Sequence, residues 1–589
     1  MGDNRNMLLA IVLSMAILFG WQYFIEGPKL EAEQARQQAI EESRAKAGVT
    51  DNGTGIAAGP SVGQGVDLGG APALKSRPDM LGQSARVAIT NARLSGSIAL
   101  TGARFDDLSL KGYTEDLEDG SPNIDLLNPE GSANPYLAEF GWIAAQGEAA
   151  KLPSGKSNWA VDGNATLTPN APVTLKWTND TGLTFTRKIE LDANYLFTVT
   201  DTVTNAGGNA ATLYPYGLIR RVGTPETTGF YILHEGLYGV LNETLQEVDY
   251  DDLQDDGPVN ANTTGGWLGI TDKYWLAALV PDQQEQVAAR FTHSLKAGRD
   301  AYQADFRGQA RVIQPGASQS VTHRFFAGAK EVNLVDAYAE DQGIQRFDLA
   351  IDWGWFYFLT KPLFLAMDFF YGVVGNFGIA IILVTLIIKI LFFPLANKSY
   401  ESMSRMKKVA PELTKIRERF ADDKQKQQQE MMELYKREKV NPASGCLPMI
   451  VQIPVFFALY KVLFVSIEMR HAPFFGWIQD LSAPDPLLIF NLFGLIPWDP
   501  PSFLAIGIWP LFMGASMFLQ QKMNPPPPDP IQARMFMLMP IFFTFLLGSF
   551  PAGLVIYWTF NNLLSIAQQY AIMRRMGVPI GGGSTDTAK

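Results

Sequence analysis

The chain has 589 residues, 47% of them hydrophobic, a formal net charge of −11 and a single cysteine, Cys446. It is too long for one hydrophobic core and should divide into domains. One cysteine excludes an intramolecular disulfide, four scattered histidines give no zinc-ligand spacing, and the acidic balance argues against nucleic acid as the main partner of the first half.

Charge divides the chain into two parts. Residues 1–345 carry 26 Lys and Arg against 42 Asp and Glu, a net of −16, whereas residues 346–589 carry 22 against 17, a net of +5. An acidic first part therefore precedes a mildly basic and strongly apolar second part.

The first element is an apolar run from Met7 to Ile25 that contains Trp21 and Tyr23 near its end. A cleaved signal peptide is the alternative, but no small-x-small cleavage pattern follows the run. Aromatic residues at the end fit a membrane interface, so residues 1–25 are predicted to be an uncleaved transmembrane anchor. Arg5 before the run and several glutamates after it place the N-terminus in the cytoplasm.

Residues 26–80 are predicted to form a flexible linker. They become rich in Gly, Ala, Ser and Pro from Ala47 onward, a composition that cannot bury a core. The strings at 59–63 and 43–46 match the nucleophile-elbow and S-x-x-K patterns, but no strand precedes either, so both are interpreted as coincidences.

Residues 81–345 are predicted to form a β domain. Short alternating runs such as 173–178, 183–189 and 195–203 are separated by turn residues, which is typical of antiparallel strands half exposed to water. About 250 such residues predict a large β-sandwich. Acidic runs near 249–256 are interpreted as solvated loops rather than as glycosidase carboxylates or calcium ligands.

Residues 346–372 are aromatic and amphipathic and are predicted to lie along the membrane interface. A second transmembrane helix follows over 373–393, with Lys389 as its only ionisable residue. A helix climbs roughly 24 Å from Val373 to Lys389, against a hydrocarbon core of about 30 Å, so the ammonium lies inside the membrane near one face. Lys389 could snorkel to that interface or face a polar cavity, and both alternatives stay open at this point.

Residues 394–445 are predicted to form a cytoplasmic helical hairpin, because this stretch carries 12 Lys and Arg against 8 Asp and Glu up to Asn441. Its apolar residues have coiled-coil a/d spacing, and the run breaks at 421–423. The spaced residues are Met406, Val409, Leu413, Ile416 and Phe420. Its basic face could meet lipid headgroups or ribosomal RNA, and a solvated loop without a partner is the alternative.

The remaining elements complete a fold of six transmembrane helices, an α-helical polytopic membrane protein with a large β domain outside the cytoplasm. Loop charges place both termini in the cytoplasm. In order, these elements are the third helix 446–467, an outside loop 468–502, the fourth helix 503–521, a cytoplasmic loop 522–534, the fifth helix 535–550, the sixth helix 553–573 and a cytoplasmic tail 574–589.

Three motifs resemble a known family. They read Lys436-Arg437-Glu438-Lys439-Val440-Asn441-Pro442-Ala443-Ser444-Gly445-Cys446-Leu447-Pro448, Gln452-Ile453-Pro454-Val455-Phe456 and Phe550-Pro551-Ala552-Gly553-Leu554-Val555-Ile556-Tyr557-Trp558. Together with the anchor and the β domain, they resemble the YidC/Oxa/Alb family of membrane-protein insertases in its Gram-negative form. The resemblance implies five core helices around a hydrophilic groove and a periplasmic β-super-sandwich without established catalysis. It also implies that a positive residue on the first core helix lines the groove.

Lys389 matches that positive residue, which is usually Arg. Lysine keeps the charge but loses the guanidinium fork, so attraction of a carboxylate is expected and bidentate gripping is not. Trp558 stands where a Tyr is common, and residues 487–502 look longer than usual for the family.

The residues expected to line the groove combine this resemblance with the polar and apolar pattern of the helices. Thr385 shares a helix face with Lys389, four residues later. Each of these candidates, Thr385 included, could instead be a helix-packing residue. The predicted groove residues are Lys389, Thr385, Gln452, Tyr557, Trp558 and Asn561, with Ser516, Thr559, Asn562, Ser565 and Gln568 as further polar candidates. The predicted apolar slide for a substrate helix consists of Ile453, Pro454, Phe456, Met517 and Phe518.

The predicted function is that of a membrane-protein insertase and chaperone, not an enzyme, with no cofactor and no metal. A groove would shorten the dehydrated path of a polar segment, and a fixed positive charge would stabilise an acidic one. The resemblance implies nascent membrane proteins, the Sec translocon and the ribosome as partners, in the bacterial inner membrane. A secondary transporter with a buried lysine and an envelope carbohydrate enzyme are the alternatives, although no internal repeat supports a transporter.

Overall fold

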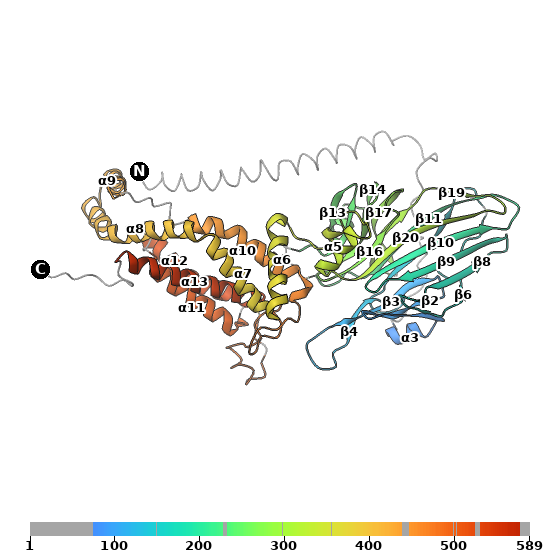
Figure 1. The fold of residues 1–589 in the computed structure, drawn as a ribbon, viewed down its shortest axis with the longest axis horizontal. Coiled ribbons are helices and arrows are strands. Elements are labelled where there is room, and N and C mark those ends of the chain that lie inside the picture. Colours follow the sequence, from blue (N-terminus) through green and yellow to red (C-terminus); the bar gives the residue numbers. More distant parts are fainter. Residues whose placement is uncertain are drawn as a thin grey trace.

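A computed structural model describes residues 75–577, apart from 149, 228–232, 297, 355, 439–446, 499, 502–503 and 525–529. The predicted anchor, nearly all of the predicted linker and most of the predicted tail lie outside the described residues. Two parts follow one another along the molecule in Figure 1, a β domain and a helical bundle.

The β domain is a sandwich of two large sheets, as the alternating runs predict. One sheet has the order β14 (Val259–Thr264), β17 (Gln286–Lys296), β18 (Arg299–Arg307), β11 (Ala211–Val222), β5 (Tyr136–Ala144), β3 (Arg104–Thr114), β2 (Leu94–Ala99), β1 (Arg86–Thr90) and β7 (Thr166–Leu167), with β4 (Asn123–Leu127) beside β3 and β19 (Arg311–Ile313) beside β11. The other has the order β13 (Thr244–Val248), β12 (Gly236–Leu241), β15 (Trp267–Thr271), β16 (Trp275–Val280), β20 (Ser318–Ala329), β10 (Leu196–Asn205), β9 (Leu183–Leu191), β8 (Val173–Thr178) and β6 (Ala160–Asp162). Short helices α3 (Arg77–Leu81), α4 (Tyr250–Asp255) and α5 (Val332–Glu340) complete the domain.

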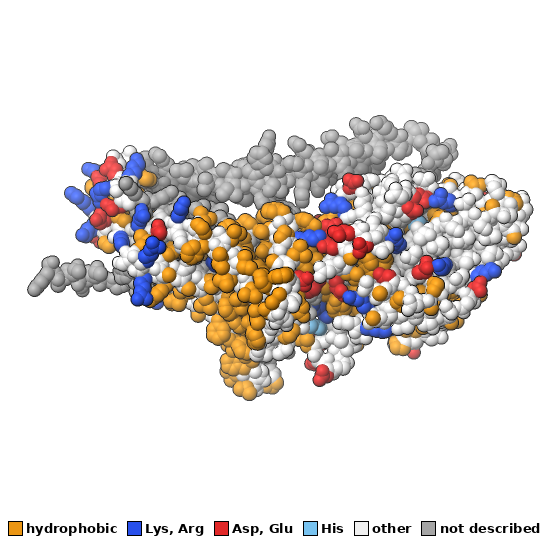
Figure 2. All heavy atoms as spheres, in the orientation of Figure 1, with side chains coloured by type: hydrophobic (Ala, Val, Ile, Leu, Met, Phe, Trp, Pro, Cys, Tyr) orange, Lys and Arg blue, Asp and Glu red, His pale blue; other side chains and the backbone are white. Residues whose placement is uncertain are grey.

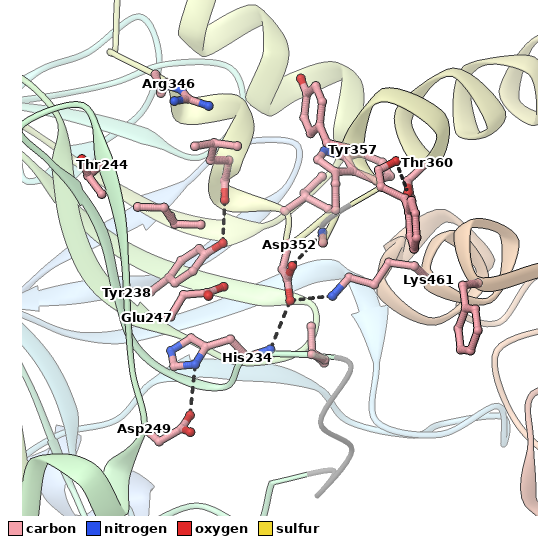
Figure 3. A pocket seen from close by; sticks show the side chains of 18 of the residues that line it. His234, Tyr238, Thr244, Glu247, Asp249, Arg346, Asp352, Tyr357, Thr360 and Lys461 are labelled. Carbon is pink, nitrogen blue, oxygen red and sulfur yellow. Dashed lines mark hydrogen bonds and ion pairs between the residues drawn. The ribbon is translucent and has the colours of Figure 1, made fainter. Parts of the chain in front are cut away.

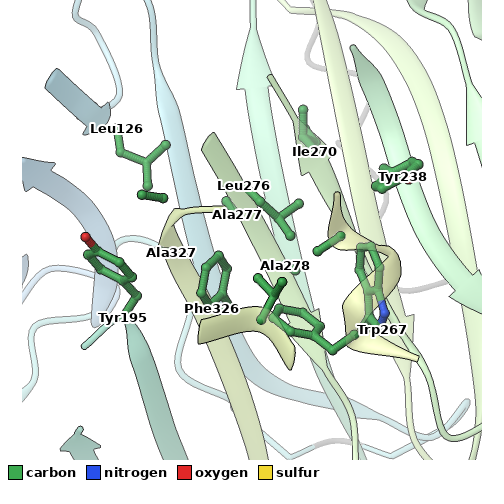
Figure 4. Close-up of a cluster of buried hydrophobic side chains, with 14 of the residues drawn as sticks. Leu126, Tyr195, Tyr238, Trp267, Ile270, Leu276, Ala277, Ala278, Phe326 and Ala327 are labelled. Atoms are coloured by element: carbon green, nitrogen blue, oxygen red, sulfur yellow. The ribbon is translucent and has the colours of Figure 1, made fainter. Parts of the chain in front are cut away.

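The core between the sheets is aromatic and encloses one ion pair. Burial alternates residue by residue along β9 and β10, so one face of each strand is turned inward. Arg187 Nε lies 2.7 Å from Asp201 Oδ1, and Arg187 also donates to the carbonyl of Phe140. The buried guanidinium is therefore fully engaged, as burial of a charge requires. Figure 4 shows Trp267 and Phe326 within this core. Both rings pack on Phe347, in the turn that follows the domain.

The helical part comprises eight α-helices among the described residues. They are α6 (Tyr357–Val374), α7 (Phe377–Leu391), α8 (Phe393–Arg419), α9 (Lys424–Arg437), α10 (Leu447–Val465), α11 (Ile508–Met523), α12 (Pro530–Leu546) and α13 (Ala552–Arg575). A short 3₁₀ turn, η2 (Phe347–Ala350), precedes them, and two more, η4 (Ile467–Met469) and η6 (Leu547–Ser549), lie between them. Helix α6 runs across the direction of α7, α11 and α13, between the bundle and the β domain (Figure 1). This orientation is the one expected of an interfacial helix.

Hydropathy alone does not confirm the predicted count of six membrane spans. Among the described residues, only α6 is long and apolar enough to pass as a span, or two spans if the bent pair α7 and α8 counts as one. The apolar runs of α10 and α12 are shorter, and α13 carries polar residues on one side. The C-terminal region is nevertheless helical, as predicted, and Figure 2 shows a large apolar surface around the middle of the molecule.

Helices α8 and α9 form a hairpin at the end of the bundle away from the β domain. Val409 and Leu413 of α8 and Leu434 of α9 are buried together, with Met406 and Ile416 beside them. The four residues of α8 belong to the predicted a/d pattern, and Leu434 lies outside it. Helix α8 begins at Phe393 and is longer than the predicted arm, because it continues directly from α7 after a bend of 68°.

Polar contacts join the β domain to the bundle. Lys461 Nζ of α10 lies 2.6 Å from Asp352 Oδ2, and Lys361 Nζ of α6 lies 2.8 Å from Asp336 Oδ1 of α5. The Val332 amide, at the start of α5, donates to Glu468 Oε1 at 2.9 Å. The two parts are thus fastened by charged side chains from both.

Candidate functional site

Lys389 lies in the last turn of α7, which positions it at the mouth of a groove in the bundle. The helix starts at Asn376, whose side chain accepts from the Ile379 amide and so satisfies one free donor of the first turn. Lys389 is half-buried, and its Nζ donates to Ser565 Oγ of α13 at 2.7 Å. Among the described residues, no carboxylate forms an ion pair with it. The ammonium is therefore bonded to a neutral hydroxyl, and its charge is available to attract an anionic group.

Helix α13 presents a polar face to the groove. Asn561, Asn562, Ser565 and Gln569 are buried on α13 at spacings that keep them on one side of a helix. Asn562 Nδ2 donates to Ser516 Oγ of α11 at 3.1 Å, so part of this face also ties α13 to its neighbour. A helix with this many buried polar groups is stable in a membrane only where each group has a partner or faces water.

Helix α10 supplies the opposite polar wall. Gln452 Nε2 donates to Asn561 Oδ1 at 2.6 Å and to the Tyr557 hydroxyl at 3.2 Å. Lys389, Gln452 and Asn561 line the same cavity, which has a volume of about 400 Å³. A polar floor with one unpaired cation can attract an acidic or polar segment of chain.

The other side of the cavity is apolar and aromatic. The Trp558 ring packs against Phe456 of α10 at 4.7 Å between centroids and against Phe543 of α12 at 5.6 Å. Ile453 is about half exposed beside them. The cavity thus passes from hydrogen-bonding groups on α10 and α13 to hydrocarbon on α10 and α12.

Most of the sequence-predicted site residues line this cavity. Those that do are Lys389, Gln452, Tyr557, Trp558, Asn561, Ile453, Phe456 and Met517, together with the further candidates Asn562 and Ser565. Thr385 is buried and its hydroxyl donates to the Ile381 carbonyl at 2.6 Å, so it is a packing residue within the bundle. Pro454 does not line the cavity, and Phe518 lies exposed on α11 with Lys522 over its ring at 4.6 Å.

Sequence reasoning missed the contribution of α8. Leu395, Ala396, Tyr400 and Met403 line the cavity from the first turns of that helix. Their spacing places them on one helix face just after the bend, so the pattern was present in the sequence. The basic composition of residues 394–445 predicts a cytoplasmic hairpin and does not distinguish these first turns, which line the groove. The missed residues of α11 and α12 are Gln520, Asn524, Met539 and Phe543.

A larger cavity of about 960 Å³ lies at the junction with the β domain (Figure 3). Its charged side chains already have partners: Asp352 accepts from Lys461, and His234 Nδ1 lies 3.1 Å from Asp249 Oδ1. The hydrogen bond from His234 lowers the pKa of the Asp249 carboxyl. Because these groups join the two parts, we regard this cavity as part of the joint and the smaller groove as the candidate site. No cluster of metal-binding side chains occurs in the part of the chain that the structure describes.

Comparison with known proteins gives consistent matches over both parts. Residues 86–366 match the family model described as YidC periplasmic domain, and residues 369–578 match the one described as 60Kd inner membrane protein. Proteins named membrane protein insertase YidC from Methylorubrum extorquens and Methylobacterium nodulans are 53% and 54% identical to the chain, over 98% of it and 96% of their own length. A solved structure of an active YidC insertase aligns over 82% of this chain and 92% of its own at 17% identity, with a TM-score of 0.35, which is too low to carry an argument. The extent and identity of the sequence matches show that the chain belongs to the YidC family of membrane protein insertases.

Proposed function

We propose that this chain inserts membrane proteins through the groove, with Lys389 attracting acidic or polar segments of the incoming chain. The observation that carries the proposal is the position of the Lys389 ammonium, half-buried beside a polar cavity and paired with a hydroxyl instead of a carboxylate. A unit charge at about 4 Å interacts with an opposite charge by roughly 4 kcal/mol at an effective dielectric constant near 20. That is enough to offset part of the cost of taking a carboxylate out of bulk water.

The apolar side of the groove would then receive the hydrophobic part of the same substrate. Ile453, Phe456 and Met517 border the cavity next to exposed apolar residues of α12. A segment leaving Lys389 would move along these side chains toward lipid without meeting a charged group. Six membrane spans with five around the groove, cytoplasmic termini and a β domain in the periplasm are part of this proposal.

The hairpin of α8 and α9 is the proposed receiving surface for substrate chains and the ribosome. It projects from the end of the bundle opposite the β domain, and its outer side is rich in Lys and Arg (Figure 2). Basic side chains of this kind attract RNA phosphates and acidic chain segments. Cooperation with the Sec translocon is proposed for the same assembly, on the strength of the family alone.

The test replaces the charge and measures insertion of substrates with acidic or neutral tails into vesicles that hold the full-length protein. We expect Lys389→Ala to lower insertion of the acidic-tailed substrate severalfold while Lys389→Arg retains it. Lys398→Ala is the matched control, because Lys398 is an exposed lysine of α8 that does not line the groove. Near-normal insertion by Lys389→Ala would refute a role for the charge.

Crosslinking tests the path independently. A photoreactive residue at Phe456 should capture a stalled nascent chain, whereas the same residue at Phe512, half exposed on α11 outside the groove, should not. Equal capture at both positions would show that the chain does not use the groove.

A further inference from the structure

Residues 486–498, the apolar loop, form a protrusion that the groove does not use. They connect α10 and its following turns to α11 and include no ionisable side chain. Their exposed large side chains are Phe490 (40%), Leu492 (51%), Phe493 (51%), Leu495 (82%), Ile496 (42%) and Trp498 (45%). A soluble surface rarely gathers so many exposed apolar side chains in one short stretch.

The apolar loop is held in a defined shape. The Phe493 amide donates to the Leu488 carbonyl at 2.9 Å, and the Ile496 amide donates to the Asn491 carbonyl at 3.0 Å. Leu492 and Phe493 both have positive φ, 50° and 63°, a conformation that is strained for side chains of this size. The loop therefore keeps a strained turn that carries its side chains outward.

Asp485 fixes the base of the apolar loop to the bundle. Its carboxylate accepts from Trp477 Nε1 at 2.9 Å and from the Trp509 amide, in the first turn of α11, at 2.7 Å. The Ile489 amide also donates to the Ile506 carbonyl at 3.1 Å. The buried carboxylate bonds to the first turn of α11 and so ties the base of the loop to that helix.

The position of the apolar loop indicates what covers it. In Figure 1 the connection between α10 and α11 hangs sideways from the bundle, at the level of α6, across the direction of the other helices. Figure 2 shows the same protrusion as mainly hydrophobic, with neither basic nor acidic side chains on the visible face. Helices α11 and α12 expose apolar side chains as well, among them Phe512 and Phe542, and in Figure 2 the hydrophobic surface continues from the bundle onto the protrusion. The apolar surface is thus continuous from these helices onto the loop.

We propose that the apolar loop is a rigid wedge inserted into the membrane leaflet nearer the β domain, on the side of α11 and α12. A protein partner would be expected to meet polar groups at the rim of its site, and the side chains of the described loop offer few. They are Asn491, whose Oδ1 accepts from the Gly494 amide at 3.0 Å, and the indole N–H of Trp498, a residue type that also suits the membrane interface. Lipid chains require no such partners. The wedge displaces lipid beside the helices that border the apolar side of the groove.

The test places a probe on the apolar loop of the full-length protein in vesicles. In a Cys446→Ser background, Leu495→Cys is labelled with an environment-sensitive fluorophore, with Leu295→Cys as the matched control. Leu295 is also a strongly exposed leucine, 69%, but it lies at the end of β17 in the β domain. Vesicles carry phosphatidylcholine with a nitroxide either near the headgroup or near the chain end.

We expect the probe at position 495 to be quenched by the shallow nitroxide more than by the deep one and to be shielded from aqueous iodide, as for groups about 5–10 Å into the leaflet. The probe at position 295 should respond to iodide alone. Iodide quenching at both positions would refute the wedge. Shielding from iodide without lipid quenching would also refute it, since a protein partner or a second copy would then cover the loop.

Discussion

Glu468 contacts α5 where the helical bundle meets the β domain. We predict that this contact, called the joint below, weakens as pH rises. Glu468, in the turn after α10, accepts from the Val332 amide through Oε1, while its Oε2 is buried without a hydrogen-bond partner among the described residues. Burial raises the pKa of Glu468 to about 7, the backbone hydrogen bond opposes the rise, and the nearby carboxylates of Glu331 and Asp368 add to it.

The sign of the effect follows from where the proton binds more tightly. A pKa above the ordinary value of 4.5 means that the closed joint holds the proton more tightly than the open one, so the joint is most stable at low pH. Stability is lost as pH rises from about 4.5 to about 7 and stays low above that. A shift of about 2.5 pKa units corresponds to roughly 3.4 kcal/mol, or about three hundredfold in the opening equilibrium.

Glu468→Gln keeps an acceptor for the Val332 amide and removes the titration. Hydrogen exchange of peptides from α5 should match wild type at about pH 4 and slow by up to about three hundredfold relative to wild type at about pH 8. Glu340→Gln is the control, because Glu340 is an exposed carboxylate at the other end of α5. Equal exchange of Glu468→Gln and wild type at both pH values would refute the reasoning.

Two further predictions concern the β domain and the bundle. Burial lowers the pKa of His323 to about 4, so the β domain should lose stability as pH falls from about 6.5 toward 4, by roughly 3 kcal/mol, and His323→Phe should abolish this loss in thermal unfolding of the full-length protein. A wild-type-like loss in that variant would contradict the assignment. A Cβ at Gly514 of α11 would lie 2.0 Å from Thr544 Oγ1 of α12, so Gly514→Ala should destabilise the pair by about 1–3 kcal/mol. Gly372→Ala, where a Cβ meets nothing within 4 Å, should cost less, and equal melting of the two variants would count against the close packing.

Periodicity predicted the elements that bury one face and leave the other in water. The strands β9 and β10 alternate as their sequences indicate, and the pattern of Val409, Leu413 and Ile416 predicted the contact of α8 with α9. The order of strands in the sheets could not be predicted from the sequence, because pairs such as β10 with β20 join residues more than a hundred positions apart. No local pattern encodes such a pairing.

In the site, too, local sequence patterns predicted single residues but not their partners on distant helices. Lys389 was identifiable as a single charge in an apolar run, but its partner Ser565 lies 176 residues away. Thr385 was placed in the groove because it precedes Lys389 by one turn, yet a buried threonine can bond to its own helix and pack like an apolar residue. Spacing gives the helix face, and only the neighbouring helices decide whether that face meets water.

The bend at Phe392 joins two helices of unequal length, the shorter α7 and the longer α8. Helix α8 has 27 residues and is about 40 Å long, so a rotation of about 10° at the bend carries its far end through roughly 7 Å. Lys389 lies three residues before the bend, on a helix that α13 holds through Ser565. Beyond the bend, Gln568 of α13 donates to Asn397 of α8 at 3.1 Å, so the same helix holds the charge and the base of the hairpin in place.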